Sequence, residues 1–455
     1  MVETTVRPNS DNVSDASGIV LDDTTLNRRH AVDLCKQYMP LLSVLRMNGI
    51  PVLPISRQRP GESRKPGPAR RYYVHLFQQH LLCLLRAETP SVWLHRQAES
   101  RESLRFSQTI HLPDDPEQKQ VQQLAVRSLY AAGLDYGAVY LGAYSPNRIR
   151  VLDVHPTPLG DRNLLLPLYR EACERYRQQQ IEEEHTRPEV VLGADPEYAL
   201  RDPSGQIGIA SRFLPKRGMV GCDAARLRDA PLSREHPLVE LRPDPSDDPD
   251  VLFAHIRHAL HKAANMITDR SLEWIAGGMP FPEYPIGGHI HFSGVSFSFQ
   301  LVRALDTYLT LPLALVEDPG CRERRPRYGF LGDFRLQPYG GFEYRTPPSW
   351  LVTPIVTRGV LSLAKLIAAN YRQLRQQPLG DPRVQRAYYT GDAARLRPIV
   401  EQLWGELVWL PQYDRFRQAL DPLFDYLWSE TVWPADKDFR SAWDLPSALN
   451  KRRKA

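Results

Sequence analysis

The chain has 455 residues, which is too long for one ordinary hydrophobic core, so two or three domains are expected. Hydrophobic residues make up 42% and charged residues 24%, the composition of a globular protein. The net charge of +5 comes from arginines spread along the chain. A dedicated nucleic-acid-binding protein would concentrate its basic residues in one stripe, so nucleic acid is not the expected partner.

The five cysteines are scattered, and no two of them form a Cys-x-x-Cys pair. This spacing argues against a zinc ribbon and against a disulfide framework. The sequence has no apolar run of 18 residues and no signal-peptide pattern at its N-terminus. We therefore expect a cytoplasmic protein without a membrane partner.

Two segments are predicted for the first part of the chain. Residues 1–25 are polar with few apolar side chains and are predicted to be disordered. Residues 26–185 are predicted to form a small N-terminal α/β domain with a charged connector helix. In chain order, this domain is expected to contain a helix over 34–47, an exposed loop over 58–70, apolar stretches over 72–85 and 91–94, a hairpin over 136–154 and the connector helix over 165–184.

Residues 186–375 combine many strand-like segments with two helical patterns, over 254–268 and 351–374. The strands do not alternate regularly with helices, which predicts an α+β fold with a mostly antiparallel sheet and flanking helices. Residues 376–455 are predicted to form a C-terminal helical extension, with helices over 392–410 and 413–428.

The central segment repeatedly places two charged or metal-binding side chains two residues apart. Residues i and i+2 of a β-strand point to the same face. Buried charges need partners or metal ions, so a sheet face crowded with them predicts an enzyme site for metal ions and phosphates. The pairs are Asp195 and Glu197, Glu240 and Arg242, His289 and His291, Asp333 and Arg335, and Glu343 and Arg345.

The first three pairs supply oxygen and nitrogen ligands. Two carboxylates on one face, as at Asp195 and Glu197, suit hard cations such as Mg²⁺. A cross-strand salt bridge is at least as good an explanation of Glu240 and Arg242 as a catalytic role. His289 and His291 follow two glycines, and either imidazole can ligate a metal or donate to a phosphate.

Arginine is frequent just before and within the last two pairs. Its planar guanidinium suits bidentate capture of carboxylate and phosphate. The arginines at 322, 324, 325 and 327 adjoin a glycine-rich segment, which favours anion capture over a solvated surface. We therefore expect Arg325 and Arg327, together with Arg335, to bind the phosphate groups of a cofactor.

Five motifs occur in a familiar order and spacing: GADPEYAL, VELRP, GGHIHF, YGFLGDFR and GGFEYRTPPSWL. Together they resemble the phage-type amidoligases of the carboxylate–amine ligase type 2 family, within the glutamine synthetase and glutamate–cysteine ligase superfamily. The resemblance covers residues 188–375 and, more loosely, much of the N-terminal half. It implies a glutamine-synthetase-like antiparallel sheet that curls around the active site and binds ATP with two or more Mg²⁺ ions, or Mn²⁺ in their place.

The resemblance also assigns roles to individual residues. His291 and Arg335 match phosphate-binding positions, and Arg345 matches a catalytic arginine on the substrate or phosphate. Which of the two histidines meets the metal stays open. Asp333, from its location, is expected to accept the proton of the attacking ammonium or to hold that ammonium in place. The implied metal ligands are Asp195, Glu197, Glu240, His289 and Glu343.

One departure from the pattern concerns the first acidic pair. Glutamine synthetases carry Glu-x-Glu there, whereas this chain has Asp195 and Glu197, and the shorter aspartate reaches less far.

The resemblance implies an ATP-dependent, ADP-forming ligase of two steps. ATP phosphorylates a substrate carboxylate to an acyl phosphate, and an amine then displaces phosphate to give an amide or peptide-like bond. The substrates are expected to be small-molecule or peptide carboxylates and amines. Family relatives often assemble, which is compatible with a homo-oligomer.

Two other classes fit parts of the same pattern. The first is a metal-dependent hydrolase or another nucleotide-dependent enzyme, although the segment from Phe292 lacks the carboxylate that a cupin carries after its His-x-His. The second is a non-enzymatic binding module for acidic or nucleic-acid partners, whose binding would fall steeply with salt and ignore ATP and Mg²⁺.

Overall fold

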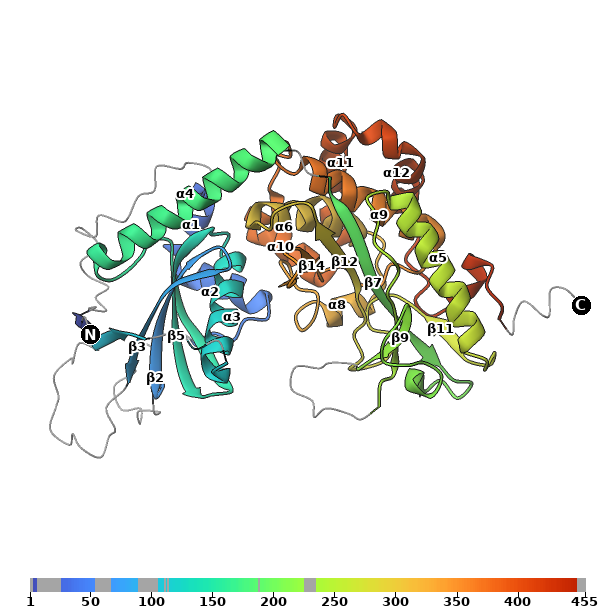
Figure 1. Ribbon diagram of the computed structural model, residues 1–455, viewed down its shortest axis with the longest axis horizontal. Helices are drawn as coiled ribbons and strands as arrows, with labels where there is room; N and C mark the ends of the chain where they lie inside the picture. The colour runs from blue at the N-terminus through green and yellow to red at the C-terminus, as the bar shows by residue number, and fades with distance from the viewer. Residues whose placement is uncertain are drawn as a thin grey trace, which may run out of the picture. The chain divides into compact units, whose positions relative to one another are not determined.

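The computed structural model describes residues 3–5, 26–53, 67–88, 105–109, 112, 114–186, 189–224 and 235–447. The chain divides into two compact units, residues 1–185 and 186–455 (Figure 1). Three sequence predictions fall outside the described residues: the disorder of 1–25, apart from the strand at 3–5, most of the loop over 58–70, and the apolar stretch over 91–94.

The first unit contains a six-stranded antiparallel sheet. In sheet order its strands are β1 (Glu3–Thr5), β4 (Arg105–Gln108), β3 (His80–Glu88), β2 (Arg70–Phe77), β5 (Tyr136–Ser145) and β6 (Arg148–His155). The predicted hairpin is present as β5 and β6. The helices described in this unit are α1 (Arg29–Cys35), α2 (Tyr38–Met47), α3 (Pro116–Ala131) and α4 (Arg162–Thr186).

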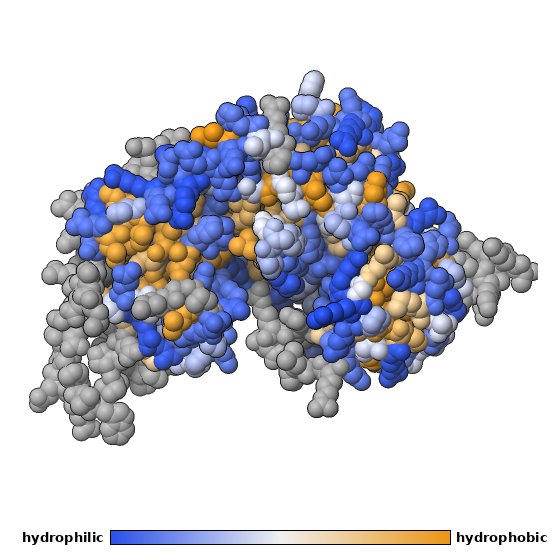
Figure 2. All heavy atoms as spheres, in the orientation of Figure 1, coloured by the Kyte–Doolittle hydropathy of each residue, from blue (hydrophilic) through white to orange (hydrophobic). Residues whose placement is uncertain are grey.

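Helices α3 and α4 cover opposite faces of this sheet. Neighbouring residues of a strand point to opposite faces, so each strand can contact both helices. Tyr73 packs with Tyr169 of α4 in one apolar cluster. Its neighbour Tyr72 points the other way and donates to Glu117 of α3 at 2.5 Å. Figure 2 shows apolar side chains gathered over the sheet beside α4. The predicted connector helix is therefore also part of this core.

The second unit is built on an eight-stranded sheet with antiparallel pairings. Its main path runs β13 (Phe334–Leu336), β14 (Phe342–Tyr344), β12 (Gly288–Ser293), β7 (Val191–Arg201), β10 (Leu238–Leu241) and β9 (Val220–Asp223). The short strands β8 (Ile207–Gly208) and β11 (Glu273–Ile275) pair with β7. The predicted α+β class with mostly antiparallel strands is confirmed here.

The α-helices of this unit are α5 (Pro249–Met266), α6 (Phe299–Leu305), α7 (Leu311–Leu313), α8 (Gly320–Arg324), α9 (Pro354–Asn370), α10 (Pro382–Thr390), α11 (Ala393–Val408) and α12 (Tyr413–Trp428). A π-helix, η2 (Asp306–Thr310), joins α6 to α7. Short 3-10 turns are η1 (Ala210–Arg212), η3 (Pro378–Gly380) and η4 (Phe439–Trp443). The two helices predicted over 254–268 and 351–374 are present as α5 and α9.

Strand β7 shows how the sheet separates its core face from its polar face. Ala194, Tyr198 and Leu200 alternate along one side and are buried, and the Tyr198 ring stacks on Trp274 of β11 at 4.8 Å. The residues between them point to the opposite face, which carries the charged pairs. Helix α5 packs against β7, β9 and β10 and also against α9.

The C-terminal residues complete the core of the second unit. The Trp443 indole donates to the carbonyl of Leu351 at 2.8 Å, and Arg440 donates to the carbonyl of Leu272 at 2.6 Å. The segment predicted as a helical extension is helical and packs within the same compact unit. Among the described residues, none of the helices has the length and apolar character needed to span a membrane.

Removing one partner of the buried Arg440–Asp438 ion pair should destabilise the second unit. The two side chains are 1% and 3% exposed. Arg440→Ala leaves a buried carboxylate without its cation and should lower the free energy of unfolding by about 3–5 kcal/mol. Urea unfolding followed by tryptophan fluorescence tests this, because Trp93 alone of the eight tryptophans lies outside 186–455.

The matched control is Arg383→Ala, because the Arg383 side chain pairs with Asp381 while 80% exposed. This variant should leave the unfolding transition nearly unchanged. Equal shifts for the two variants would contradict the role assigned to the buried pair.

Candidate active site

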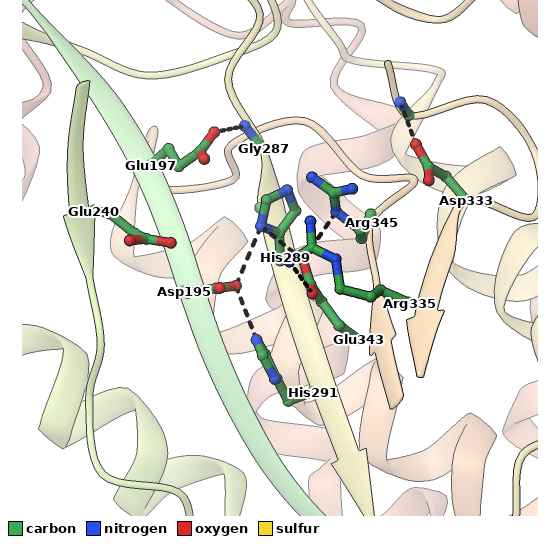
Figure 3. Close-up of polar contacts among 12 residues, drawn as sticks. Asp195, Glu197, Glu240, Gly287, His289, His291, Asp333, Arg335, Glu343 and Arg345 are labelled. Atoms are coloured by element: carbon green, nitrogen blue, oxygen red, sulfur yellow. Dashed lines mark hydrogen bonds and ion pairs between the residues drawn. The ribbon is translucent and has the colours of Figure 1, made fainter. Parts of the chain in front are cut away.

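Charged side chains gather on one face of the eight-stranded sheet, around the centre of β7 (Figure 3). The antiparallel register places His289 of β12 opposite Asp195 and Glu240 of β10 opposite Glu197. Residues opposite each other in a ladder share a face, as do residues i and i+2. Four of the predicted metal ligands therefore meet on neighbouring strands.

Strand β14 extends this row on the other side of β12. Glu343 lies opposite His291 of β12 and opposite Arg335 of β13. Arg345 follows at i+2 from Glu343, just beyond the end of β14. The same face thus carries the fifth predicted metal ligand and both predicted catalytic arginines.

Asp195, His289 and Glu343 form a group that we call the histidine triad, in which one ligand atom of each residue lies within 4.8 Å of the others. The His289 Nδ1 atom is 3.3 Å from Asp195 Oδ1 and 3.4 Å from Glu343 Oε1. The His291 Nε2 atom is 3.1 Å from the same Asp195 oxygen. Two carboxylates and an imidazole are a donor set that Mg²⁺ or Mn²⁺ accepts.

Glu343, whose side chain is only 1% exposed, forms ion pairs with two arginines and accepts one hydrogen bond from Gln337. Arg345 Nε lies 2.9 Å from Oε1, while Arg335 Nη1 and Gln337 Nε2 lie 3.1 and 3.0 Å from Oε2. The Arg335 side chain is 53% exposed. Its guanidinium therefore reaches from the buried carboxylate to the solvent, where it can also meet an anion.

Glu197, Asp223 and Glu240 form a second group, the carboxylate triad, again with ligand atoms within 4.8 Å of one another. Glu197 Oε2 accepts a hydrogen bond from the Gly287 backbone N–H at 2.7 Å. Glu240 forms an ion pair with Arg242, two residues further along the same segment, and not with a residue of a neighbouring strand. Three carboxylates that share a single ion pair, with Arg242, among the described residues form a suitable set of ligands for a hard divalent cation.

The charges in this site shift one another's proton affinities. Burial raises the pKa of Glu197. Burial would also raise the pKa of Asp195, but the imidazoles of His289 and His291 outweigh it and hold that pKa well below its usual range. In turn, Asp195 and Glu197 raise the pKa of His289 against the opposing effect of burial. These carboxylates therefore make the His289 imidazole bind a proton more readily than a free imidazole does.

The ligand atoms of this site also fit a cation that they could share. Within the histidine triad, Asp195 Oδ1 and His289 Nδ1 are buried, and neither makes a hydrogen bond to another described residue. Unsatisfied polar atoms in the protein interior are rare and call for a partner. A divalent cation in the histidine triad would supply one, in place of the proton on His289.

Asp333 is not directed into this group of ligands. It is buried, and its carboxylate accepts a hydrogen bond from the Gly329 backbone N–H at 3.0 Å. Figure 3 shows it apart from Asp195 and Glu343, with its carboxylate bonded to a backbone nitrogen. Its backbone N–H donates to Thr346 Oγ1 at 3.3 Å. These contacts order the turn before β13.

The predicted cationic segment upstream of β13 is largely internal. Arg325 is 2% exposed, forms an ion pair with Glu317, and donates to the carbonyl of Tyr388. Arg324 is also buried, and its guanidinium donates to the carbonyls of Thr346 and Pro347. Arg327 is exposed at the surface. Burial and pairing of Arg325 do not support the prediction that it binds an anion.

One site residue, and two tyrosines that contact the histidines of β12, are absent from the sequence-based set. Asp223 ends β9 without a charged residue two positions away, so it carries no pair signal. Tyr328 places its hydroxyl 2.6 Å from His289 Nε2, and Tyr339 places its own 3.1 Å from His291 Nδ1. The tyrosines lie 39 and 48 positions from these histidines, so no local pattern links them.

Comparison with known proteins identifies one family. The family model for phage phiEco32-like COOH.NH2 ligase-type 2 matches residues 192–445, which include every residue of both triads. No curated protein matches the chain.

Several solved structures align with the chain, at low similarity. They include the ATP-grasp ligase PsnB complexed with a minimal precursor, at 15% identity over 29% of this chain and 55% of that chain, with a TM-score of 0.21. A bifunctional glutathione synthetase from Pasteurella multocida aligns at 13% identity over 58% of this chain and 52% of that chain, with a TM-score of 0.36. The GmaS/ADP complex aligns at 14% identity over 70% of this chain and 85% of that chain, with a TM-score of 0.30. The chain spans about half the length of the first two, and these likenesses are too weak to support a functional conclusion.

Cation binding in the histidine triad should tighten as the pH rises. The raised pKa of His289 keeps a proton on the imidazole that a bound cation must displace. Below that pKa the proton competes and affinity falls, whereas above it the affinity reaches a plateau. Calorimetric titration with Mn²⁺ from about pH 6 to about pH 9, in two buffers of different ionisation enthalpy, should show proton release on binding at the acidic end.

The control for this prediction is His289→Gln, which keeps a polar side chain but has no proton to displace. Its residual Mn²⁺ affinity should depend much less on pH than that of the wild type. A wild-type affinity that stays constant over the whole range would contradict the proposed competition.

Proposed function

Because the chain belongs to the phage phiEco32-like COOH.NH2 ligase-type 2 family, we propose that it is an ATP-dependent, ADP-forming carboxylate–amine ligase. The observation that carries the proposal is the pair of triads side by side on β7, with Arg335 and Arg345 at the edge of the histidine triad. The product is an amide or peptide-like bond, formed between small-molecule or peptide substrates. In this proposal the antiparallel sheet curls around the reacting groups, as in glutamine synthetases.

The two triads would hold two divalent cations. Asp195, His289 and Glu343 offer oxygen and nitrogen ligands for one, and the carboxylate triad offers oxygen ligands for the other. Mg²⁺ bound there would neutralise the phosphates of ATP and favour in-line transfer of the γ-phosphoryl group. Asp195 and Glu197 lie two residues apart on one strand, so the protein fixes the spacing of the two sites.

The arginines are suited to the charge that develops during transfer. Arg345 and Arg335 each keep one nitrogen on Glu343, which orients both guanidiniums towards the same place. Their remaining N–H groups can donate to phosphoryl oxygens as negative charge grows on them. His291, whose Nε2 atom lies close to Asp195, adds a further polar side chain beside these arginines.

The chemistry balances in two steps. An oxygen of the substrate carboxylate attacks the γ-phosphorus, the bond from phosphorus to the bridging oxygen breaks, and ADP leaves. The amine nitrogen then attacks the acyl carbon, the carbon–oxygen bond to phosphate breaks, and the amine loses one proton. The sequence predicts Asp333 as the acceptor of that proton, but its carboxylate is engaged with Gly329. We propose instead that Asp333 orders the turn beside Arg345.

Nucleotide binding is the first test of this function. A non-hydrolysable ATP analogue should bind in the presence of Mg²⁺ and bind much more weakly without it, as measured by calorimetric titration. Glu343→Gln should weaken the Mg²⁺-dependent binding by about tenfold or more, because a ligand of the histidine triad is lost. Amine and carboxylate pairs can then be screened for ADP release.

Asp381→Asn is the control, since Asp381 lies outside both triads and pairs with exposed Arg383. It should bind the analogue as the wild type does. A wild-type protein that binds no nucleotide under any of these conditions would overturn the ligase proposal and favour a hydrolase or a binding module.

The two predicted cofactor-binding arginines, Arg335 and Arg325, should respond differently to alanine substitution. Arg335→Ala should weaken binding of the ATP analogue by about tenfold, the loss expected for a charge-assisted hydrogen bond, and leave thermal unfolding unchanged. Arg325→Ala strands the buried Glu317 carboxylate and should lower the free energy of unfolding by about 3–5 kcal/mol. Calorimetry and thermal unfolding of both variants separate the roles, and the opposite assignment of effects would contradict them.

A further inference from the structure

Tyr328 connects the histidine triad to Arg345, although it belongs to neither triad. Its hydroxyl oxygen lies 2.6 Å from His289 Nε2 and accepts a hydrogen bond from Arg345 Nη2 at 3.0 Å. It follows α8 in the chain, in the turn that leads to β13. One oxygen atom thus joins an imidazole that faces the carboxylates and a guanidinium that pairs with Glu343.

The position of the Tyr328 ring is fixed by two guanidiniums. The central carbon of Arg345 lies 5.0 Å from the ring centroid and that of Arg324 lies 4.8 Å from it. Arg324 is itself tied to the backbone carbonyls of Thr346 and Pro347, which follow Arg345 directly. The tyrosine, its hydroxyl included, is therefore held by the chain segment that carries Arg345.

The glycine after this tyrosine is required for the arrangement. Gly329 has a φ of +71°, and a Cβ there would lie 1.9 Å from Arg324 Nη1. A larger residue would displace the guanidinium that packs on the Tyr328 ring. A glycine after Tyr328 therefore leaves room for the Arg324 guanidinium that packs on the tyrosine ring.

The ring nitrogens of His289 face two different groups. Nδ1 faces Asp195 and Glu343, whereas Nε2 faces Tyr328. A neutral imidazole ligates a metal only through the nitrogen without a proton, and the partner of the other nitrogen fixes which one that is. When Nδ1 ligates a cation, the proton of the neutral imidazole is on Nε2, and the Tyr328 oxygen at 2.6 Å is placed to accept it.

We propose that Tyr328 is a positioning residue that sets the tautomer and orientation of His289, so that Nδ1 ligates the divalent cation, and that it couples this cation to Arg345. The proposal rests on the proposed function only in that the histidine triad binds a cation. It also answers the question of which histidine meets the metal, in favour of His289.

The second tyrosine–histidine contact provides a matched comparison. Tyr339 is 61% exposed and contacts His291, which lies outside both triads. Removal of its hydroxyl should leave the ligands of the cation in place. The variants Tyr328→Phe and Tyr339→Phe therefore remove the same atom from two similar contacts with different expected consequences.

The test is Mn²⁺ binding, followed by the electron paramagnetic resonance signal of the free ion. Tyr328→Phe should weaken Mn²⁺ binding by about 10- to 100-fold, the range for a group that orients a metal ligand, whereas Tyr339→Phe should change it little. Thermal unfolding of both variants checks that the fold is intact. Equal Mn²⁺ affinities for the wild type and Tyr328→Phe would overturn the proposal and leave the ligase function standing.

A second measurement does not depend on how well the variant folds. Nitrogen-15 NMR of the wild-type histidines with Mg²⁺ bound, with His289 identified by its absence in His289→Gln, should show the proton on Nε2. A proton on Nδ1 would overturn the tautomer assignment. A wild-type protein that binds no Mn²⁺ at all would overturn both this inference and the two-cation site on which the proposed function depends.

Discussion

The second unit is organised around the burial of several carboxylates on one face of an antiparallel sheet. Glu197, Glu240 and Glu343 are all nearly inaccessible to solvent. A buried carboxylate is costly unless it is paired and hydrogen-bonded. Each of the three has a different compensating group, namely a backbone N–H from Gly287, the Arg242 guanidinium, and the arginines around Glu343. Among the described residues, the three acids of the carboxylate triad have one ion pair, with Arg242, and this shortage of positive charge favours a bound cation.

Strand alternation lets the same short segments serve the core and the site at once. Tyr344 stands between Glu343 and Arg345 in the chain and points to the opposite face. Its hydroxyl donates to Asp306 at 2.7 Å and lies 2.6 Å from Thr310 Oγ1, at the two ends of the π-helix η2. Single π-turns inside helices are frequent near functional sites. Here the hydrogen bonds to η2 anchor β14 on the core face of the sheet. The same strand positions Glu343 and Arg345 on the opposite face.

The acid, histidine and arginine pairs could be predicted from the sequence because the period of two is a local property of a strand. The register was not local: only the fold shows that His289 lies opposite Asp195 and Glu240 opposite Glu197. Asp223 joins the carboxylate triad from a strand with a single acid, so the sequence offered no pair to detect. The family resemblance rested on the joint order of five motifs, and the family match over 192–445 confirms it.

Residue type and local density do not distinguish a buried, paired arginine from an exposed one, and the reason is physical. Arg325 and Arg335 are both guanidiniums near carboxylates, yet the Arg325 side chain is paired and closed off from solvent while that of Arg335 is half exposed. A guanidinium that is buried and ion-paired inside the protein cannot reach a ligand in the solvent. One that shares a carboxylate with a second arginine, as Arg335 does at Glu343, keeps part of its donor set directed outwards. Glu343 thereby orients two guanidiniums. Through Arg345 and Tyr328 it is also linked to His289, which faces the Glu343 carboxylate.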